Sequence, residues 1–575
     1  MDHTSSLVAL LAERARSQAN DRAYIFLSDR GGEEAVLTYG ELHGAAQALA
    51  ARLMSFAHPG DRALLVFPPG LEFVVAFFGC LLAGIIAVPM MMPRRNARDA
   101  SSAILANCEP VIALTTSAFT LRQDLLSRFE RAGLQWLAVD LADGAAADTG
   151  RLPPLPLPDP QAIAFLQYTS GSTSDPKGVA VTHANLIANL EMIRLSYGNT
   201  SHSTFVNWVP LYHDMGLILN TLEPLYVGAL CVLMTPNGFM QRPLNWLRAI
   251  HHYKAEVTSS PNFGFDLCVA RYRADQMQDV DLSSWKVASV GAEPVRAETL
   301  RKFIDTFAAH GFHPEAMFPA YGMAEATLLI TGGRRGAGHL TRTVSAAALQ
   351  AHRVALPADA GDAQTVVGCG RALVGEQIAI VDPDTRARLP LDRVGEIWVD
   401  GPNIARLYWR NEEATAADLN ARIAGEDTTA RWLRTGDLGF LDQSGELFVT
   451  GRIKDLIIIR GINHYPQDIE QTVQRLHPSL RQNGGAAFPV PDENGEETLV
   501  VVQEIERTER HRIDQKELEE LIREGIADQH ELFARHIALI RPGTLPKTTS
   551  GKIQHALARK LWLERRLQLL DAEAE

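Results

Sequence analysis

Residues 166–186, LQYTSGSTSDPKGVAVTHANL, place a hydroxyl-rich turn directly after a short apolar run. Gly171 and Gly178 let backbone N–H groups approach a ligand closely, and Lys177 adds a positive charge. Four hydroxyl side chains supply further hydrogen-bond donors: Thr169, Ser170, Ser172 and Thr173. This combination indicates a phosphate-binding loop, with a plain surface loop as the alternative. The spacing differs from the GxxxxGK[ST] nucleotide loop, so a different phosphate chemistry is expected.

The composition limits the class of protein. The chain has 575 residues, a formal net charge of -13 and 46% hydrophobic residues. At about 150 residues per domain, this length predicts roughly three or four structural units. The acidic balance argues against a protein that binds nucleic acid by broad phosphate neutralisation. The five cysteines are scattered without a CxxC pair, so neither a disulfide framework nor a zinc site is expected.

The longest apolar stretch, LEFVVAFFGCLLAGIIAVPMMMP at 71–93, reaches the length of a membrane span. Glycines interrupt it, so we expect a buried helix over 72–83 and a buried strand over 85–88 that ends before Pro89. A membrane span is the alternative. The N-terminal segment has charges within a helical pattern, unlike a secretory signal, and a cytoplasmic protein is expected.

The organisation of the chain changes twice. Up to about residue 370, short apolar strands such as RALLVFPP alternate with helical patterns, which predicts parallel sheets with helices on both faces. Beyond it, RTGDLGFLDQSGELFVTG predicts antiparallel strands. We therefore expect an α/β core of two doubly wound sheets plus a small barrel over 1–453. A hinge at Lys454 and Asp455 and a smaller, mobile α+β domain over 456–575 complete the expected architecture.

Five motifs in a fixed order resemble the adenylate-forming superfamily, which includes acyl-CoA synthetases, peptide-synthetase adenylation domains and luciferases. They are YTSGSTSDPKGV (168–179), YGMAE (321–325), RTGDLG (434–439), GRIKDLIIIRGINHYPQDIE (451–470) and LPKTTSGKIQ (545–554). Each motif alone is a weak signal, but five in order span most of the chain. The resemblance implies ATP and Mg²⁺ as the nucleotide and the metal.

The resemblance implies nucleotide contacts for several residues that also have ordinary structural alternatives. Asp437 would accept both ribose hydroxyls, or it only caps its turn. Arg452 would lie near the same ribose, or it is a surface charge. Glu325 would hold Mg²⁺ on the phosphates, or it is an acid in the first turn of a helix. The remaining predicted nucleotide contacts are Gly291, Ala292, Glu293, Tyr321 and Gly322, with a strand-end turn or plain core as the alternatives.

Three residues are predicted to be catalytic. The resemblance implies that Lys552 enters the active site and bridges the carboxylate of the acid and the α-phosphate. A cation between two reacting anions stabilises their transition state, while a solvated surface lysine is the alternative. His213 would orient the carboxylate, or it is a hydrogen-bonded core histidine. Lys177 would follow the leaving polyphosphate.

The stretches WVPLYHDMGLI, PNFGFDLC, GAEPVR and AYGMAEATLLITGG closely resemble fatty acyl-AMP ligases. The segment near 332–366 resembles the insertion of that subfamily, which would hinder the rotation that exposes the adenylate to coenzyme A. A tolerated surface loop is the alternative. Apolar residues predicted to line an acyl tunnel, with plain core as the alternative, are Met215, Gly216, Met234, Phe263 and Phe265.

The resemblance therefore implies an enzyme that converts a fatty acid and Mg·ATP into acyl-adenylate and pyrophosphate. The acyl group would then pass to the phosphopantetheine thiol of an acyl carrier protein. The segment 545–554, which carries Lys552, is called the lysine loop below. Because the chain ends soon after this loop, the carrier is expected on a separate polypeptide. An acyl-CoA synthetase is the alternative. A third hypothesis is a catalytically silent protein that senses acyl or adenylate ligands by binding.

Overall fold

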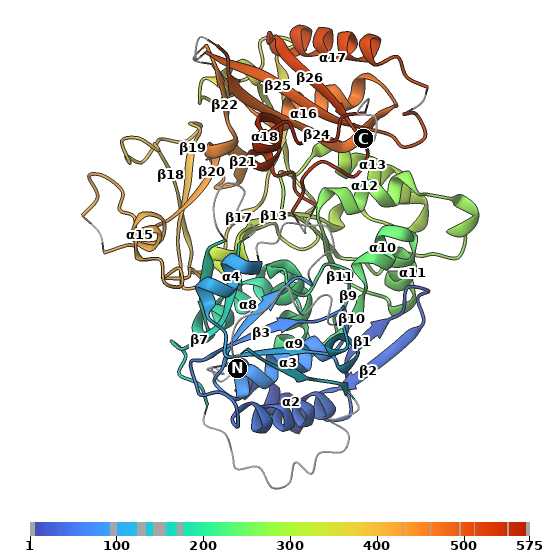
Figure 1. Cartoon of the computed structure of the whole chain (residues 1–575), viewed down its shortest axis with the longest axis vertical. Coiled ribbons are helices and arrows are strands. Elements are labelled where there is room, and N and C mark those ends of the chain that lie inside the picture. Colours follow the sequence, from blue (N-terminus) through green and yellow to red (C-terminus); the bar gives the residue numbers. More distant parts are fainter. Residues whose placement is uncertain are drawn as a thin grey trace.

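The computed structural model describes residues 6–92, 101–122, 134–141, 157–169, 176–427, 429–460, 462–493, 496–510, 512–548 and 551–570. Figure 1 shows two α/β sheets in the lower part of the molecule and the C-terminal residues above them. Antiparallel strands lie beside the C-terminal part. This division agrees with the order of patterns along the sequence.

The larger sheet has nine strands in the order β17-β14-β13-β12-β11-β9-β10-β1-β2. Their bounds are β1 Arg22–Leu27, β2 Glu33–Thr38, β9 Thr204–Asn207, β10 Leu230–Met234, β11 Val257–Ser260, β12 Val287–Val290, β13 Met317–Gly322, β14 Leu329–Gly332 and β17 Arg371–Ala372. The strands from β1 through β13 in this order are parallel, whereas β2, β14 and β17 add antiparallel edges. Every residue of β11 and β12 is buried, as expected for strands covered on both faces.

The second sheet has six strands in the order β6-β5-β3-β4-β7-β8. Their bounds are β3 Arg62–Val66, β4 Ile86–Met90, β5 Ile112–Thr115, β6 Gln135–Ala138, β7 Ile163–Tyr168 and β8 Gly178–Thr182. The apolar stretch forms helix α3, Glu72–Leu82, followed by β4. The predicted break at Pro89 is wrong, because β4 continues to Met90. Pro89 lies beyond the Ala87–Phe165 pair that joins β4 to β7, so its missing N–H removes nothing from that ladder.

Helices cover both sheets. Besides α3 they are α1 Leu7–Ser17, α2 Tyr39–Leu53, α4 Ser101–Cys108, α5 Ser117–Thr120, α8 His183–Tyr197, α9 Glu223–Val227, α10 Pro236–Gln241, α11 Leu244–Tyr253, α12 Asn262–Ala270, α13 Ala297–Phe307 and the π-helix η3, Met215–Leu222. Capping boxes at Thr38 and Thr182 begin α2 and α8. Among the described residues, no helix is both long enough and apolar enough to cross a membrane.

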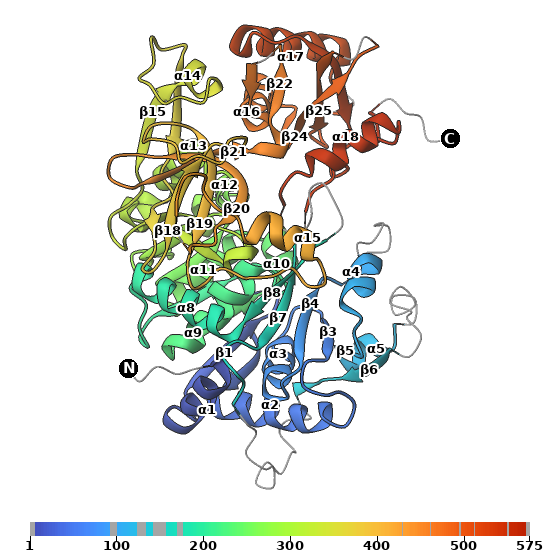
Figure 2. The same cartoon turned by 90° about the vertical axis from the view of Figure 1, so that its left-hand side faces the viewer.

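The antiparallel part is a four-stranded sheet in the order β18-β19-β20-β21, and it occupies the place of the predicted small barrel. The strands are β18 Gln377–Val381, β19 Gly395–Asp400, β20 Leu433–Leu441 and β21 Leu447–Arg452, with the short helix α15, Glu412–Ala414, between β19 and β20. The predicted insertion forms the hairpin of β15, Thr341–Ser345, and β16, Ala363–Val367, which encloses helix α14, Ala346–Gln350. Figure 2 shows this hairpin beside the C-terminal part.

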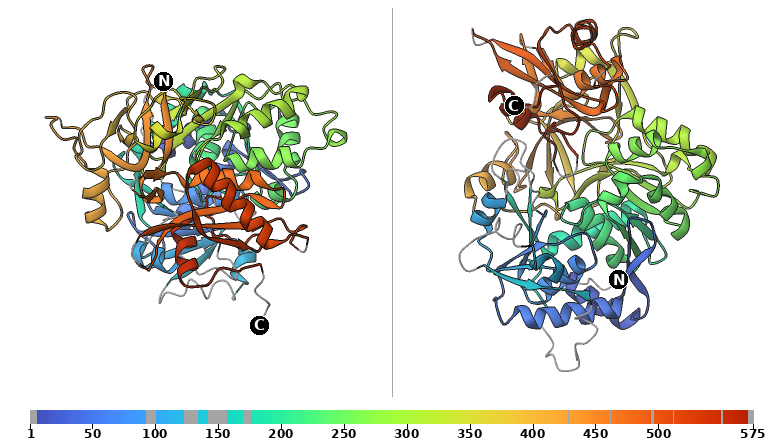
Figure 3. Two further views of the ribbon diagram at one scale, coloured as in Figure 1. Left: turned by 90° about the horizontal axis from the view of Figure 1, so that it is seen from above. Right: turned by 45° about the vertical axis from the view of Figure 1, so that its right-hand side comes forward.

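The C-terminal part is built around a three-stranded sheet in the order β24-β25-β26. Its elements are β22 Ile457–Ile459, β23 Ile462–His464, α16 Pro466–Leu476, β24 Leu480–Pro491, β25 Glu497–Ile505, α17 Gln515–His530, β26 Ala534–Ile540 and α18 His555–Leu563. Its two main apolar clusters are distinct from the core of the N-terminal part. The 3-10 turn η9, Ile453–Asp455, joins β21 to β22 and contains both predicted hinge residues. Figure 3 shows this part stacked on the rest of the molecule.

Candidate active site

The carboxyl ends of the parallel strands form one edge of the large sheet, which is where open α/β sheets bind ligands. Gly291 and Ala292 follow β12 at this edge. A Cβ on Gly291 would lie 2.9 Å from the Ala320 carbonyl oxygen and 4.0 Å from Met215 Cε. Ala292 has a φ of +67°, a strained conformation that persists mainly at functional sites. The predicted adenine contacts and Met215 are therefore brought together.

A buried polar cluster surrounds Asp437. Its Oδ2 accepts a hydrogen bond from the Tyr321 hydroxyl at 2.8 Å, and its Oδ1 accepts one from Arg452 Nε at 2.8 Å. Asp437 and Arg452 are register partners on β20 and β21, so the antiparallel sheet positions this pair. Burial, with the Asp437 carboxylate, raises the pKa of Tyr321 well above its usual value. Asp437 raises the pKa of Arg452, so the guanidinium stays charged.

Glu325 lies buried in the turn that follows β13. Its Oε1 accepts a hydrogen bond from the Tyr408 hydroxyl at 2.9 Å, and Lys177 Nζ lies 4.7 Å from the centroid of the Tyr408 ring. Lys177 also forms a 2.7 Å ion pair with Asp418. Burial raises the pKa of Glu325, so a cation bound beside it would offset the cost of its buried charge. Tyr408 and Asp418 were not predicted, since nothing in their local sequence marks them.

The donor set around Glu325 fits Mg²⁺ held jointly with phosphates. Among the described residues, no group of three or more His, Cys, Asp or Glu side chains lies close enough to hold a metal by itself. Mg²⁺ commonly binds one or two carboxylates and takes its other ligands from water and substrate phosphates. A single buried carboxylate therefore suits a metal that arrives with the nucleotide.

The turn that carries Glu325 is tightly constrained. Thr327 has φ +66° and ψ −62°, and Leu328 N donates to the Ala326 carbonyl at 2.7 Å across it. This γ-turn conformation is rare and strained for a β-branched residue. The Thr327 hydroxyl donates to the Asn403 carbonyl at 2.6 Å, which ties the turn to the chain after β19. The strained residue thus lies two positions after Glu325, the predicted metal ligand.

Gly322→Ala should disturb this turn and destabilise the protein. A Cβ on Gly322 would lie 1.9 Å from the Leu328 carbonyl oxygen, so the backbone must shift. We expect a loss of about 1–3 kcal/mol of stability, the usual cost of overpacking, together with a higher KM for Mg·ATP. Gly333→Ala is the matched control, since its Cβ would meet Phe318 only at 3.7 Å. Thermal melts and ATP titrations check this, and equal behaviour of the two variants would refute it.

Lys552 reaches from the C-terminal part to residues of the N-terminal part. Burial lowers the pKa of Lys552, as does the charge of Arg452, whereas Asp214, Asp437 and Glu293 favour the ammonium. Carboxylates from three separate segments of the N-terminal part therefore act electrostatically on the Lys552 ammonium. A Cβ on the preceding residue, Gly551, would lie 2.9 Å from Phe263 Cε1, which shows how closely the lysine loop approaches α12.

Further contacts join the two parts in this arrangement. Arg475 of α16 pairs with Glu298 of α13. Asn483 Nδ2 of β24 donates to Asp266 Oδ2 of α12 at 3.4 Å. Both contacts are present in the arrangement in which the lysine loop approaches α12.

His213 lies next to an acid that also faces Lys552. Its Nδ1 is 3.3 Å from Asp214 Oδ1, and that oxygen accepts the Met215 N–H at 2.7 Å where η3 begins. Burial alone would raise the pKa of Asp214, but His213 and Lys552 hold it below its usual value. A Cβ on Gly216 would lie 2.0 Å from the Pro210 carbonyl oxygen, so the turn into η3 requires glycine. Asp214 was missed, although it is adjacent to His213 in the HDMG motif.

The structure describes only part of the predicted phosphate-binding loop. Ser170, Gly171, Ser172 and Thr173 lie outside the described residues. Thr169, at the end of β7, donates its N–H to the Lys177 carbonyl at 3.1 Å, so the two ends of the loop are in contact.

The predicted acyl-pocket residues separate into two groups. Phe263 is partly buried, and its ring lies 5.6 Å from that of Trp208. Phe265 instead packs within the aromatic core, 5.6 Å from Trp246 and 4.9 Å from Phe303, so the structure does not place it with Phe263. Met234 ends β10 and is buried. The role of these residues in acyl binding stays a prediction.

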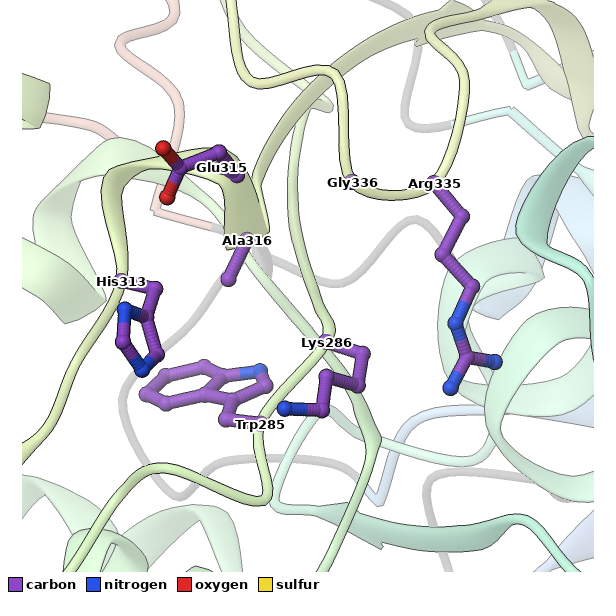
Figure 4. A pocket seen from close by; sticks show the side chains of 7 residues that line it. All are labelled: Trp285, Lys286, His313, Glu315, Ala316, Arg335 and Gly336. Atoms are coloured by element: carbon purple, nitrogen blue, oxygen red, sulfur yellow. The ribbon is translucent and has the colours of Figure 1, made fainter.

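A pocket of about 240 Å³ lies before the amino ends of β12 and β13, opposite the edge described above (Figure 4). Two of its cations are already engaged. Arg335 pairs with Glu256 at 2.8 Å, and Lys286 Nζ donates to the Ser283 carbonyl at 2.6 Å. This pocket is therefore separate from the predicted chemistry.

A family model described as AMP-binding enzyme matches residues 11–409. The chain belongs to the AMP-binding enzyme family. A second model, described as Disco-interacting protein 2-like, AMP domain, matches residues 454–572 of this AMP-binding enzyme. The second match begins at Lys454 of the predicted hinge, whose role stays a prediction.

Relatives of this AMP-binding enzyme match along almost its whole length. Medium-chain-fatty-acid–[acyl-carrier-protein] ligase JamA of Moorena producens is 42% identical over 99% of this chain and 97% of its own. A fatty acyl-adenylate ligase from L. pneumophila, solved with acyl adenylate and pyrophosphate, is 40% identical with a TM-score of 0.73, covering 99% of this chain and 98% of its own. A structure from work on fatty acyl-adenylate ligases of E. coli and L. pneumophila is 32% identical with a TM-score of 0.86, covering 97% of this chain and 98% of its own. These likenesses confirm the predicted α/β fold with a large N-terminal and a smaller C-terminal domain.

Proposed function

We propose that this AMP-binding enzyme is a fatty acyl-AMP ligase that works in the cytoplasm. It activates a fatty acid with ATP, releases pyrophosphate and transfers the acyl group to the phosphopantetheine thiol of a separate carrier protein. The observation that carries the proposal is Lys552 of the C-terminal part, whose charged form is favoured by Asp214, Asp437 and Glu293 of the N-terminal part and whose loop approaches Phe263 of α12. The names of the similar proteins support a fatty acid as substrate and a carrier as acceptor.

In this proposal, the nucleotide lies along the sheet edge. Asp437 accepts the ribose hydroxyls, and Arg452, which donates to its Oδ1 at 2.8 Å, holds the carboxylate in place. Gly291 and Ala292 present backbone to the adenine. Glu325 holds Mg²⁺, which, when bound, neutralises part of the charge on the phosphates. The Tyr408 hydroxyl orients the Glu325 carboxylate for this contact.

The proposed chemical step joins two anions. A carboxylate oxygen of the fatty acid attacks the α-phosphorus, a new O–P bond forms, and the bond to the bridging oxygen of pyrophosphate breaks. The Lys552 ammonium lies between the carboxylate and the α-phosphate and stabilises the charge that concentrates there. His213 orients the carboxylate. Pyrophosphate leaves toward the 169–177 loop, where Lys177 offsets its charge.

The choice of acceptor depends on contacts between the insertion hairpin and the C-terminal part. Asn463 Nδ2 donates to the Gln350 carbonyl at 2.9 Å and lies 2.8 Å from His352 Nε2. Gln364 Nε2 donates to Asp468 Oδ2 at 3.0 Å. Burial raises the pKa of Asp468 to about 7. A rotation about Lys454 and Asp455 would have to break these contacts.

The free-energy cost of breaking these hairpin contacts favours a protein acceptor. A carrier protein brings its own contact surface, whose burial can offset broken contacts, whereas coenzyme A offers far fewer contacts. The hairpin therefore supports the carrier-dependent reaction over the synthesis of free acyl-CoA.

The test is to identify products by mass spectrometry. We expect fatty acids and Mg·ATP to give acyl-adenylate and pyrophosphate, and a phosphopantetheinylated carrier protein to become acylated. Coenzyme A in place of the carrier should give little acyl-CoA. Abundant acyl-CoA would favour an acyl-CoA synthetase. The absence of pyrophosphate release with every fatty acid would instead favour a silent ligand-binding protein.

The double variant Gln364→Ala/Asn463→Ala should relax the choice of acceptor. It removes the hydrogen bonds that Gln364 and Asn463 make between the hairpin and the C-terminal part, each worth roughly 0.5–1.5 kcal/mol. We expect acyl-CoA formation to rise by about 10-fold, with adenylate formation within about twofold of the wild type. Gln467→Ala is the control, because the bond it loses, to the Thr450 carbonyl, joins the C-terminal part to β21 and not to the hairpin. Unchanged acyl-CoA formation would count against a restraining role of the hairpin.

A further inference from the structure

A buried histidine connects the hinge turn to the base of the lysine loop. His555 is the first residue of α18 and follows Lys552 by three positions. Its Nε2 lies 2.6 Å from Glu470 Oε1 on α16, and its Nδ1 lies 3.9 Å from Asp455 Oδ2 in η9. The side chains of His555 and Glu470 are 17% and 7% exposed. One ring thus lies between two carboxylates that come from different elements.

These surroundings favour the imidazolium form of His555. Burial lowers its pKa, but Glu470 and Asp455 outweigh burial and the opposing charge of Arg452, so the pKa lies above its ordinary value. A cation at the first position of a helix is disfavoured by the helix dipole, so its charge depends on these two acids. Only the imidazolium donates from both ring nitrogens. Glu470 is itself fixed, since its Oε1 also accepts the Ala487 N–H of β24 at 2.9 Å.

The lysine loop is closed mainly on itself. Thr548 N donates to the Lys552 carbonyl at 2.7 Å, and Lys552 N donates to Thr548 Oγ1 at 3.1 Å. Gln554 N donates to the Pro546 carbonyl at 3.0 Å at its base. These bonds hold the shape of the loop but do not link it to the hinge. His555, at the base, makes that link.

We propose that His555 is a positioning residue for adenylate formation: by bridging Asp455 of the hinge turn and Glu470 of α16, it holds the base of the lysine loop where Lys552 reaches the reacting groups. His555 itself touches no substrate. The inference rests on the proposed role of Lys552. It adds a contact that must be present in the adenylating arrangement and that involves the hinge directly.

The first test compares His555→Gln, which is neutral, with His555→Arg, which keeps a charge that does not titrate. In single-turnover assays of pyrophosphate release at pH 6.5, we expect His555→Gln to be about 10-fold slower than wild type, the loss of one hydrogen bond to a charged group. The KM values for ATP and fatty acid should stay within about twofold, and His555→Arg should recover most of the rate. His536→Gln is the matched control, since His536 lies against Trp562 of α18 and away from the hinge.

The pH profile separates the charge from a general loss of structure. The pKa of His555 is raised, so its bridge is complete below the ordinary histidine pKa of about 6.5 and is lost as the pH rises through the higher pKa of the folded protein. The ratio of wild-type to His555→Gln rates should therefore be largest at acidic pH and approach one at alkaline pH. Titration of Lys552 cancels in this ratio, because both proteins contain it.

A readout independent of activity completes the test. Hydrogen–deuterium exchange over 551–558, a segment that excludes Trp562, should rise in His555→Gln and stay unchanged in His536→Gln. Transfer from supplied synthetic acyl-adenylate to a phosphopantetheinylated carrier should be equal in all variants.

The proposal is overturned if His555→Gln matches wild type in rate and exchange, or if His555→Arg is no better than His555→Gln. Absence of pyrophosphate release in the wild type would count against the proposed function alone, and the exchange result would still decide on the bridge. If His555→Gln folds poorly, Glu470→Gln replaces it, since the amide still accepts the Ala487 N–H.

Discussion

Lys552→Ala should reduce the rate of acyl-adenylate formation by a factor on the order of 10²–10³, the usual effect of removing one preorganised charge from a transition state. Asp214, Asp437 and Glu293 of the N-terminal part all favour the charged form of Lys552. Pyrophosphate release from fatty acid and ATP measures the loss. Binding of ATP, followed by calorimetry, should stay within a few-fold of wild type, because Lys552 acts where carboxylate and phosphate meet.

Lys560→Ala is the control for this experiment. Lys560 lies on α18, is 65% exposed and faces Glu564 at 4.0 Å, so its loss should change neither folding nor rate. Transfer of the acyl group from supplied acyl-adenylate to the carrier should survive in Lys552→Ala. A Lys552→Ala enzyme that releases pyrophosphate within threefold of the wild-type rate would remove this lysine from the mechanism.

Asp437→Ala should weaken ATP binding by roughly 10- to 100-fold, since bonds to charged acceptors are worth about 1.5–3 kcal/mol each. It should also destabilise the protein. The Tyr321 hydroxyl is buried and would lose its acceptor, which costs about 1–3 kcal/mol. The Arg452 side chain is 41% exposed and can turn toward water, so its loss of the Asp437 partner should add little to the destabilisation. Calorimetric titration with ATP and thermal unfolding measure the two effects separately.

Asp442→Ala distinguishes the two contributions. Asp442 lies in the turn after β20, where its Oδ1 accepts the N–H groups of Ser444 and Glu446 at 2.8 and 3.0 Å. Its loss should lower the melting temperature and leave ATP affinity unchanged. If Asp437→Ala lowers only the melting temperature as well, the ribose contact is refuted and Asp437 serves the sheet alone.

Much of the fold was predictable, because its signals are local. Short buried strands between helical patterns indicated covered parallel sheets, and the apolar stretch around α3 was correctly separated into helix and strand. The failure at Pro89 has a non-local cause. Whether a proline breaks a strand depends on which neighbour would have used its N–H, and that is a property of the sheet.

The candidate site was predictable where one motif carries both a ligand-binding side chain and the turn that presents it. Asp437 and Glu325 follow glycine-containing turns, and the structure buries both. The partners of Asp437, namely Tyr321 and Arg452, were among the predicted residues, but those of Glu325 and Lys177 were not predictable. Tyr408 meets Glu325 across 83 positions, and Lys177 meets Asp418 across 241. No pattern in the sequence indicates such long-range pairs, since each side chain alone looks like an ordinary polar residue.

The sequence by itself determined the α/β class, the order of the motifs and the chemical types of the residues at the site. These follow from short-range periodicity and from turns, which need no distant partner. Only the tertiary structure decided that Asp214, Glu293 and Asp437 act electrostatically on Lys552, that Phe265 packs in the core, and that His555 joins the hinge to the lysine loop. Charge, burial and pKa depend on which groups folding brings within a few ångströms, and spacing along the chain does not encode that distance.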